Sequence, residues 1–268
     1  MTLSALCAVS GGAAAPFELR GKRPNILLIT TDDQGTTLGC YGDPLGRTPN
    51  MDRLAAEGMR FTRAYVTHAS CSPSRSSILT GLYPHQNGQI GLAGAHPEYG
   101  VKRDIPTLPG ILKESGYYNG IIGKLHVTPQ DIFPFDFEWR KHQALKTRDV
   151  REVARQAGRF LDAAEDRPFF LYVNYFDPHR PYDEDANQYM GLPKDPYTPD
   201  EVEPFPYLHA DGDPVRREVA GYYNAQRRAD DGLGMLLETL REAGHVEDTL
   251  IIFLGDHGVP FVRAKTTC

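Results

Sequence analysis

Four strand-like segments, each rich in apolar residues and each followed at once by charged residues, constrain the fold of this chain most strongly. These segments are Pro24–Thr31, Tyr117–Ile122, Pro168–Phe176 and Thr249–Leu254. Strands that are buried on both faces read as continuous apolar runs, and such strands are typical of parallel sheets. Helix-like segments alternate with them, so the sequence predicts an α/β fold with a mainly parallel central sheet and helices on both faces.

The segments between the strands carry helical signals. Thr48-Pro49 has the N-cap residue and first-turn proline of a helix that stops at Gly58. Apolar residues from Val150 to Leu161 form one stripe, which predicts an amphipathic helix. Three further helices are predicted over Ser76–Gly81, Thr107–Glu114 and Val215–Ala243, the last with an interruption at Gly232 and Gly234.

One further strand and one long loop are also predicted. Phe61–Val66 is predicted to be a further strand. The stretch from Arg180 to Pro214 is rich in proline, aspartate and tyrosine and is predicted to be a long ordered loop over the site.

Charged residues follow each strand-like run, at Asp32-Asp33, Lys124 with His126, His179, and Asp256-His257. In open α/β folds, sites gather at the carboxyl ends of strands, so we expect these four groups to converge. The two acidic pairs form a hard site that suits Ca²⁺ or Mg²⁺. His257 would also tolerate Mn²⁺ or Zn²⁺. For Asp32-Asp33 taken alone, a strand-ending turn is the alternative.

The residues beside the acidic pairs suggest proton and anion chemistry. Lys124 and His126 alternate, so on an extended segment they would project to the same side, where they could fix a nucleophile and shuttle a proton. A solvated lysine and histidine would look the same. His179 is a candidate acid for a leaving group, and Lys265 is a candidate contact for an anion.

The segment Cys71-Ser72-Pro73-Ser74-Arg75 has the features of a reactive helix start. Pro73 suits the first turn of a helix, where its missing N–H costs nothing. Cys71 would then lie at a helix N-terminus, where free N–H groups and the dipole favour an anion. Arg75 adds a planar cation with several donors. A buried or loop cysteine beside a capping Ser-Pro is the alternative.

Two residues are expected at the mouth of the pocket. His85, within His85-Gln86-Asn87-Gly88, follows the helix predicted after Cys71, and Arg180 follows His179 in a stretch with several tyrosines. Amide and imidazole groups beside apolar ring surfaces suit a sugar, so both residues are candidates for substrate binding.

Composition excludes some functions and leaves export open. With 268 residues, a net charge of −6 and a pI near 5.8, the chain lacks the basic character of a nucleic-acid binder, and an anionic substrate must be captured locally. No apolar run approaches the roughly 20 residues of a membrane helix. Leu3–Ala15 resembles a short export signal without the usual basic start, which favours a periplasmic or secreted location. A disordered extension or a cytoplasmic location is the alternative.

The motifs together resemble the sulfatase family of the alkaline-phosphatase superfamily, and most closely its heparan N-sulfatase (sulfamidase) subgroup. The resemblance spans about residues 24–263 and rests on Cys71–Arg75 with its Cys-x-Pro-x-Arg pattern, His85–Gly88, Ile121–Val127, Phe133–Phe137 and Arg167–His179. It implies a hydrolase that removes sulfate from a sulfated sugar, with N-sulfoglucosamine as the expected substrate.

The resemblance also implies roles for individual residues. Cys71 would be oxidised to formylglycine by a formylglycine-generating enzyme and would act as the nucleophile. The modified Cys71 would bind Ca²⁺, or Mg²⁺ or Mn²⁺, together with Asp32, Asp33, Asp256 and His257. Arg75, Lys124 and His126 would support the aldehyde hydrate, and His179 and Lys265 would bind sulfate and assist the leaving group.

Some features depart from the family pattern. Sulfamidases place asparagine at the position of His257 and arginine near that of Lys265. Residues 1–23 are expected to be a leader or extension, and residues 24–268 an incomplete N-terminal catalytic domain whose C-terminal subdomain is missing. An O-sulfatase on another glycan, a phosphodiester or phosphonate monoester hydrolase, and an inactive truncated fragment are the alternative functions.

Overall fold

A computed structural model of the protein describes residues 23–140, 148–182, 191–262 and 264–265. The strands are β1 (Asn25–Thr31), β2 (Tyr118–Gly123), β3 (Phe137–Trp139), β4 (Phe169–Tyr175) and β5 (Thr249–Gly255). The α-helices are α1 (Pro49–Glu57), α2 (Cys71–Thr80), α3 (Pro84–Asn87), α4 (Leu108–Glu114), α6 (Val150–Ala164) and α8 (Asp213–Glu242). Short 3-10 helices are η1 (Gly39–Tyr41), η2 (Gln130–Ile132), η4 (Pro199–Glu201) and η5 (Pro206–Leu208).

The strands form one parallel sheet in the order β3-β2-β4-β1-β5. Thr31 at the end of β1 lies opposite both Tyr175 of β4 and Gly255 of β5. Gly123 at the end of β2 lies opposite Asn174. Four strands therefore end at nearly the same level, which confirms the predicted parallel sheet and brings the residues that follow them to one edge.

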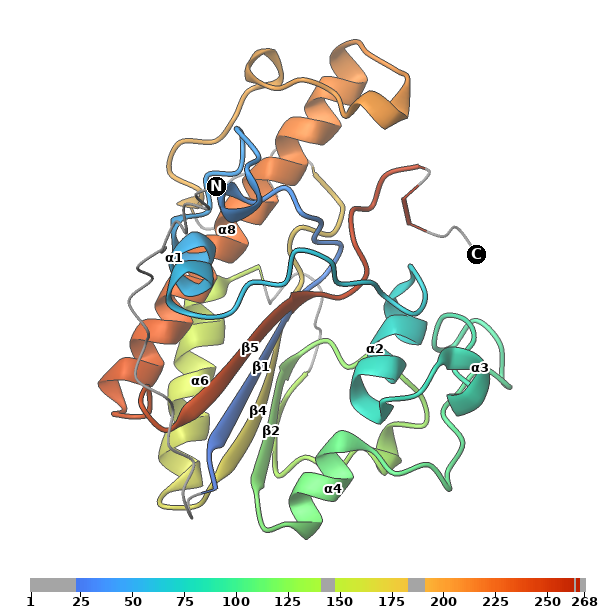
Figure 1. Ribbon diagram of the computed structural model, residues 1–268, viewed down its shortest axis with the longest axis vertical. Helices are drawn as coiled ribbons and strands as arrows, with labels where there is room; N and C mark the ends of the chain where they lie inside the picture. Colours follow the sequence, from blue (N-terminus) through green and yellow to red (C-terminus); the bar gives the residue numbers. More distant parts are fainter. Residues whose placement is uncertain (1–22, 141–147, 183–190, 263, 266–268) are drawn as a thin grey trace, which may run out of the picture.

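Helices cover both faces of this sheet, as predicted (Figure 1). Alternate residues of β4 supply the two cores, because successive side chains of a strand point to opposite faces. Leu171 and Val173 pack in the core with α1, α6 and α8, whereas Phe170 and Tyr172 pack in the core with α2 and α4. Burial of β4 on both faces explains why its sequence is a continuous apolar run.

The predicted interruption of the last helix is wrong, because α8 is continuous over 30 residues. Gly232 packs against the sheet, and a Cβ atom there would lie 2.8 Å from side-chain atoms of both Tyr175 and Val150. The hydroxyl of Tyr175 donates a hydrogen bond to the Gly232 carbonyl oxygen at 2.8 Å. Gly232 therefore permits close packing of helix and sheet and does not break the helix.

The predicted strand Phe61–Val66 is also wrong, because the structure has no strand there. Phe61, Tyr65 and Val66 are exposed, and this segment pairs with none of the five strands. Aromatic and β-branched residues favour a strand only where a neighbouring strand and a buried face are available.

The other predicted helices are found with shifted ends. The helix expected from Ser76 begins at Cys71, and Thr107 caps α4 by accepting a hydrogen bond from the Gly110 N–H. The predicted leader lies outside the described residues except for Arg23. Within the described chain, no helix has the length and apolar character needed to cross a membrane.

Candidate functional site

The carboxyl edge of the sheet carries the candidate site. Asp32 follows β1 directly, Lys124 follows β2, and Asp256 follows β5. The Asp256 carboxylate accepts the Asp33 backbone N–H at 3.0 Å, which ties the ends of β1 and β5 together. Asp33 has a left-handed φ of 69°, an uncommon conformation for a residue other than glycine that often marks a functional turn.

Cys71 lies at the start of α2 and faces this edge. Its Sγ atom is 3.5 Å from Asp32 Oδ1 and 3.3 Å from His257 Nε2. The preceding Ser70 has an extended backbone, and Pro73 stands within the first turn of the helix. The thiol is therefore buried at a helix N-terminus, among groups that can bind a cation.

The acidic residues form a tight buried cluster with His257. Its Nε2 atom lies 3.0 Å from Asp33 Oδ1, 3.4 Å from Asp256 Oδ1 and 3.9 Å from Asp32 Oδ1. Possible ligand atoms of Asp32, Cys71, Asp256 and His257 all lie within 4.8 Å of one another. Asp32, Asp33, Cys71 and His179 form a second such group. Carboxylate oxygens at this spacing suit Ca²⁺ or Mg²⁺, so the residues fit the expected metal.

Protonation within the cluster indicates that it requires positive charge. Burial opposes the charged form of Asp32, but Lys124 and Arg75 hold its pKa well below the usual range. Burial and the charge of Asp32 raise the pKa of Asp256. Burial disfavours protonated His257, yet its contacts with Asp33 and Cys71 outweigh this and raise its pKa to about 10. A cation that binds here must take the place of that proton.

Arg75 is fully buried and contacts the acidic cluster through Asp256. Its Nε atom donates to Asp256 Oδ2 at 3.1 Å. Its Nη1 atom donates to the Lys124 carbonyl oxygen at 3.0 Å and to Asn174 Oδ1 at 2.5 Å. The family resemblance implied that this guanidinium supports the aldehyde hydrate; its hydrogen bonds here go to protein groups.

Lys124 and His126 lie beside Asp32, but the segment that carries them is not extended. The Lys124 Nζ atom is 2.5 Å from Asp32 Oδ2. His126 has a left-handed φ of 52°, so strand-like alternation does not explain where its side chain points. Burial, followed by the charges of Lys124 and Arg75, lowers the pKa of His126 to about 3. Its imidazole is therefore neutral near pH 7.

Lys265 and His179 approach Asp33 from two other segments. Lys265 Nζ donates to Asp33 Oδ1 at 2.6 Å. Burial opposes the charge of Lys265, but Asp33 and Cys71 raise its pKa above the usual value. His179 Nε2 lies 3.8 Å from Asp33 Oδ2. Two lysines and a histidine thus surround the acidic cluster.

Comparison with known proteins identifies the family. The sulfatase family model matches residues 24–266. The chain belongs to the sulfatase family. The resemblance read from its motifs is thereby confirmed.

Relatives and solved structures agree with this assignment. Human N-sulphoglucosamine sulphohydrolase is 36% identical over 265 residues, which cover 92% of this chain and 53% of the human enzyme. An ulvan-active sulfatase of Formosa agariphila is 30% identical and covers 89% of this chain and 45% of its own. The solved structure of a 2-O GAG sulfatase, 20% identical, covers 88% of this chain and 58% of its own with a TM-score of 0.69. The fold is therefore alkaline-phosphatase-like, and the chain spans about half the length of the curated relatives it matches.

The two residues predicted to bind substrate, His85 and Arg180, contact other groups. His85 is exposed on α3 and stacks on Tyr83, with ring centroids 5.7 Å apart. Arg180 Nε pairs with Glu218 Oε2 at 2.9 Å, and its guanidinium lies 5.6 Å from the Phe261 ring centroid. Their role in substrate binding stays a prediction.

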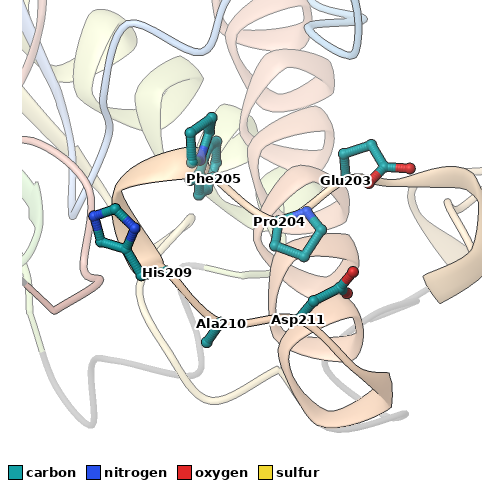
Figure 2. A pocket seen from close by; sticks show the side chains of 7 residues that line it. Glu203, Pro204, Phe205, His209, Ala210 and Asp211 are labelled. Atoms are coloured by element: carbon teal, nitrogen blue, oxygen red, sulfur yellow. The ribbon is translucent and has the colours of Figure 1, made fainter.

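A separate hollow of about 330 Å³ lies in the segment before α8 (Figure 2). Its lining residues are Glu203, Pro204, Phe205, Pro206, His209, Ala210 and Asp211. Arg216 pairs with both carboxylates, Glu203 at 3.1 Å and Asp211 at 2.8 Å. None of the predicted site residues lines this hollow, so the cluster around Cys71 remains the candidate site.

Two buried amide residues that were not predicted from the sequence support the candidate site. Asn174 Oδ1 accepts hydrogen bonds from both Arg75 and Thr30, the latter at 2.6 Å. Gln226 Oε1 on α8 accepts from Gln34 Nε2 at 2.9 Å and from Thr37 Oγ1 at 2.6 Å, which fixes the loop after Asp33. An amide inside the apolar strand β4 was a usable signal for Asn174, because buried amides need partners.

Proposed function

We propose that this chain carries the catalytic centre of a sulfohydrolase that removes sulfate from a sulfated sugar, with N-sulfoglucosamine as the substrate. The observation that carries the proposal is the position of Cys71, at the start of α2 and within 3.5 Å of both Asp32 and His257. Membership of the sulfatase family supports the reaction class. The 36% identity to human N-sulphoglucosamine sulphohydrolase supports the substrate.

The proposed centre uses a divalent cation and a modified cysteine. Asp32, Asp33, Asp256 and His257 would hold the cation, which we take to be Ca²⁺, although Mg²⁺ or Mn²⁺ would also fit. When bound, the cation neutralises the carboxylates and polarises a sulfate oxygen. Cys71 would be converted to formylglycine by a formylglycine-generating enzyme, and the hydrated aldehyde supplies the nucleophilic oxygen.

The remaining residues bind the anion and move protons. The side chains of Lys124, Lys265 and His179 are 18%, 22% and 29% exposed, whereas the carboxylates of Asp32 and Asp33 are at most 1% exposed. An entering sulfate therefore meets the two ammonium groups before the carboxylates, and Lys124 and Lys265 would bind it. His179 would donate a proton from Nε2 to the leaving nitrogen or oxygen. Neutral His126 can accept a proton during breakdown of the intermediate.

Sulfate release from two sugars tests the proposal. The protein is produced together with a formylglycine-generating enzyme and supplied with N-sulfoglucosamine or 6-O-sulfated N-acetylglucosamine under equal conditions with Ca²⁺. We expect faster release from N-sulfoglucosamine, and no release by Cys71→Ala. A preference for the O-sulfate would remove N-sulfoglucosamine as the substrate and leave the reaction. A preference for an aryl phosphodiester over either sulfate would contradict the sulfohydrolase.

Export is a separate proposal. Leu3–Ala15 has the small and apolar residues of a short signal and ends in Ala13-Ala14-Ala15. A reporter enzyme fused after residue 23 should leave the cytoplasm and lose the leader. A reporter that stays in the cytoplasm with the leader uncleaved would contradict export.

A further inference from the structure

A buried Arg-Asp-Arg cluster lies behind the turn that carries His179. Arg228 of α8 forms a bidentate pair with the Asp177 carboxylate. Its Nε donates to Oδ2 at 2.7 Å and its Nη2 donates to Oδ1 at 3.0 Å. Arg148, two residues before α6, adds Nη1 at 3.1 Å from Asp177 Oδ1. All three side chains are at most 1% exposed. Helix α8 and the segment before α6 therefore hold one carboxylate located two residues before His179.

The same cluster also binds the backbone of the turn. Arg148 Nη2 donates to the carbonyl oxygen of His179 at 2.7 Å and to that of Pro181 at 3.0 Å. The Arg148 guanidinium lies 4.8 Å from the ring centroid of Phe176, at the start of the turn. Arg148 thus contacts the turn before, at and after His179.

The His179 ring is held largely by its own turn. Its Nδ1 atom is 2.7 Å from the Arg180 carbonyl oxygen, and its ring centroid is 4.8 Å from that of Phe176. Its Nε2 atom lies 3.8 Å from Asp33 Oδ2, too far for a hydrogen bond. The position of Nε2 relative to the acidic cluster therefore follows the position of the turn.

Packing alone gives no reason to bury these charges. Buried ion pairs are costly to desolvate, and apolar residues of similar volume are often equally stable in their place. These charged groups make directional hydrogen bonds instead. The bidentate Arg228 fixes the orientation of the Asp177 carboxylate, and the Arg148 donors fix the peptide group that follows His179. We propose that Arg148, Asp177 and Arg228 are positioning residues that fix the turn and thereby aim His179 Nε2 at the site.

The consequence of this placement for catalysis rests on the proposed function, whereas the placement itself does not. The test therefore has one arm that needs no activity. The variants are Arg228→Lys and Arg148→Lys, which keep the charge and remove the planar fork. The control is Arg227→Lys on the same helix, because Arg227 binds the carboxylate and the carbonyl oxygen of Asp195 instead.

The first arm is NMR of imidazole-labelled histidine, with the His179 signals among the nine histidines assigned by His179→Gln. We expect both test variants to shift or split the His179 signals, and Arg227→Lys to leave them unchanged. If one variant does not fold, the other decides. Unchanged His179 signals in a folded test variant would overturn the proposal.

The second arm compares leaving groups. An aryl sulfate has a good leaving group and needs little help from an acid, whereas a sugar sulfamate or sulfate needs more. We expect Arg228→Lys to lower kcat for the sugar about 10-fold more than for the aryl sulfate, and to add nothing in a His179→Gln background. Equal losses on both substrates would overturn positioning of the acid. Inactivity of the unmodified protein on every sulfate would count against the proposed function alone, since the NMR arm still decides the placement.

Discussion

Arg75→Lys tests how the site is held together. Arg75 is fully buried, and its guanidinium makes directed contacts with Asp256, Asn174, the Lys124 carbonyl oxygen and the Tyr172 hydroxyl. A lysine keeps the positive charge beside Asp256 but cannot reproduce a planar fork. The substitution therefore removes the Arg75 donor from the Lys124 carbonyl oxygen and leaves Asn174 Oδ1 with the hydrogen bond from Thr30.

The expected loss of stability follows from the lost hydrogen bonds. Leaving the buried Lys124 oxygen without its donor costs about 1–3 kcal/mol, and the lost charged hydrogen bond to Asn174 and the weakened pairing with Asp256 add to this, so we expect a loss of roughly 3–5 kcal/mol. For a domain of this size, such a loss lowers Tm by roughly 10 °C.

Urea unfolding followed by far-UV circular dichroism measures this loss. The matched control is Arg103→Lys, because Arg103 binds Asp131 at 2.6 Å but its side chain is 67% exposed. Exposed pairs contribute little, so the control should leave the midpoint unchanged. Equal midpoints for the two variants, with equal m-values, would refute the view that the Arg75 fork holds the site.

Three further predictions concern the metal, the packing of α8 and a buried acid. Calcium at about 100 times its Kd should raise the free energy of unfolding by about 2.7 kcal/mol. Asp256→Asn should abolish this gain. A melting temperature that changes with neither calcium nor chelator would count against the metal site. Gly232→Ala should lower the free energy of unfolding by about 1–3 kcal/mol, because its Cβ would meet side chains at 2.8 Å. Gly158→Ala in α6, whose Cβ would lie 3.6 Å from the nearest atom, should be neutral or stabilising in thermal unfolding. An equal loss of stability at both sites would contradict the packing argument. Burial raises the pKa of Asp230 to about 6, above its unfolded value, so its contribution is present at about pH 4 and below and is lost as the pH rises through about 6. The stability difference between the wild type and Asp230→Asn should change by on the order of 3 kcal/mol across that range, and no change in unfolding experiments would exclude the raised pKa.

The sheet could be predicted because its central strands β1 and β4 are buried on both faces and its edge strand β5 is equally apolar, although Leu250 and Ile252 of β5 are exposed. The runs that became β1, β4 and β5 are continuous and apolar, so no partner strand had to be known to recognise them. β3 spans three residues and has too short a pattern to detect. The strand prediction for Phe61–Val66 was wrong for the opposite reason. Its residues favour a strand, but the segment pairs with no other strand.

The candidate site was predictable where its residues follow strands, and not where they act from a distance. Asp32 and Asp256 could be expected to meet, because the carboxyl ends of parallel strands share one edge. Arg148, from the segment before α6, and Arg228, from α8, both reach Asp177, and no local spacing reveals such contacts. The left-handed backbone of His126 likewise breaks the strand-like alternation that the sequence suggested.

The chemical state of Cys71 is the most direct test of the proposed catalytic centre. The protein is isolated from the cells that make it naturally and digested with trypsin, and the peptide Ala64–Arg75 is analysed by mass spectrometry. The proposed mechanism predicts a peptide about 18 Da lighter than the thiol form, carrying an aldehyde at residue 71. A peptide found only as the unmodified thiol would contradict a formylglycine nucleophile, and with it the sulfohydrolase mechanism proposed for this site.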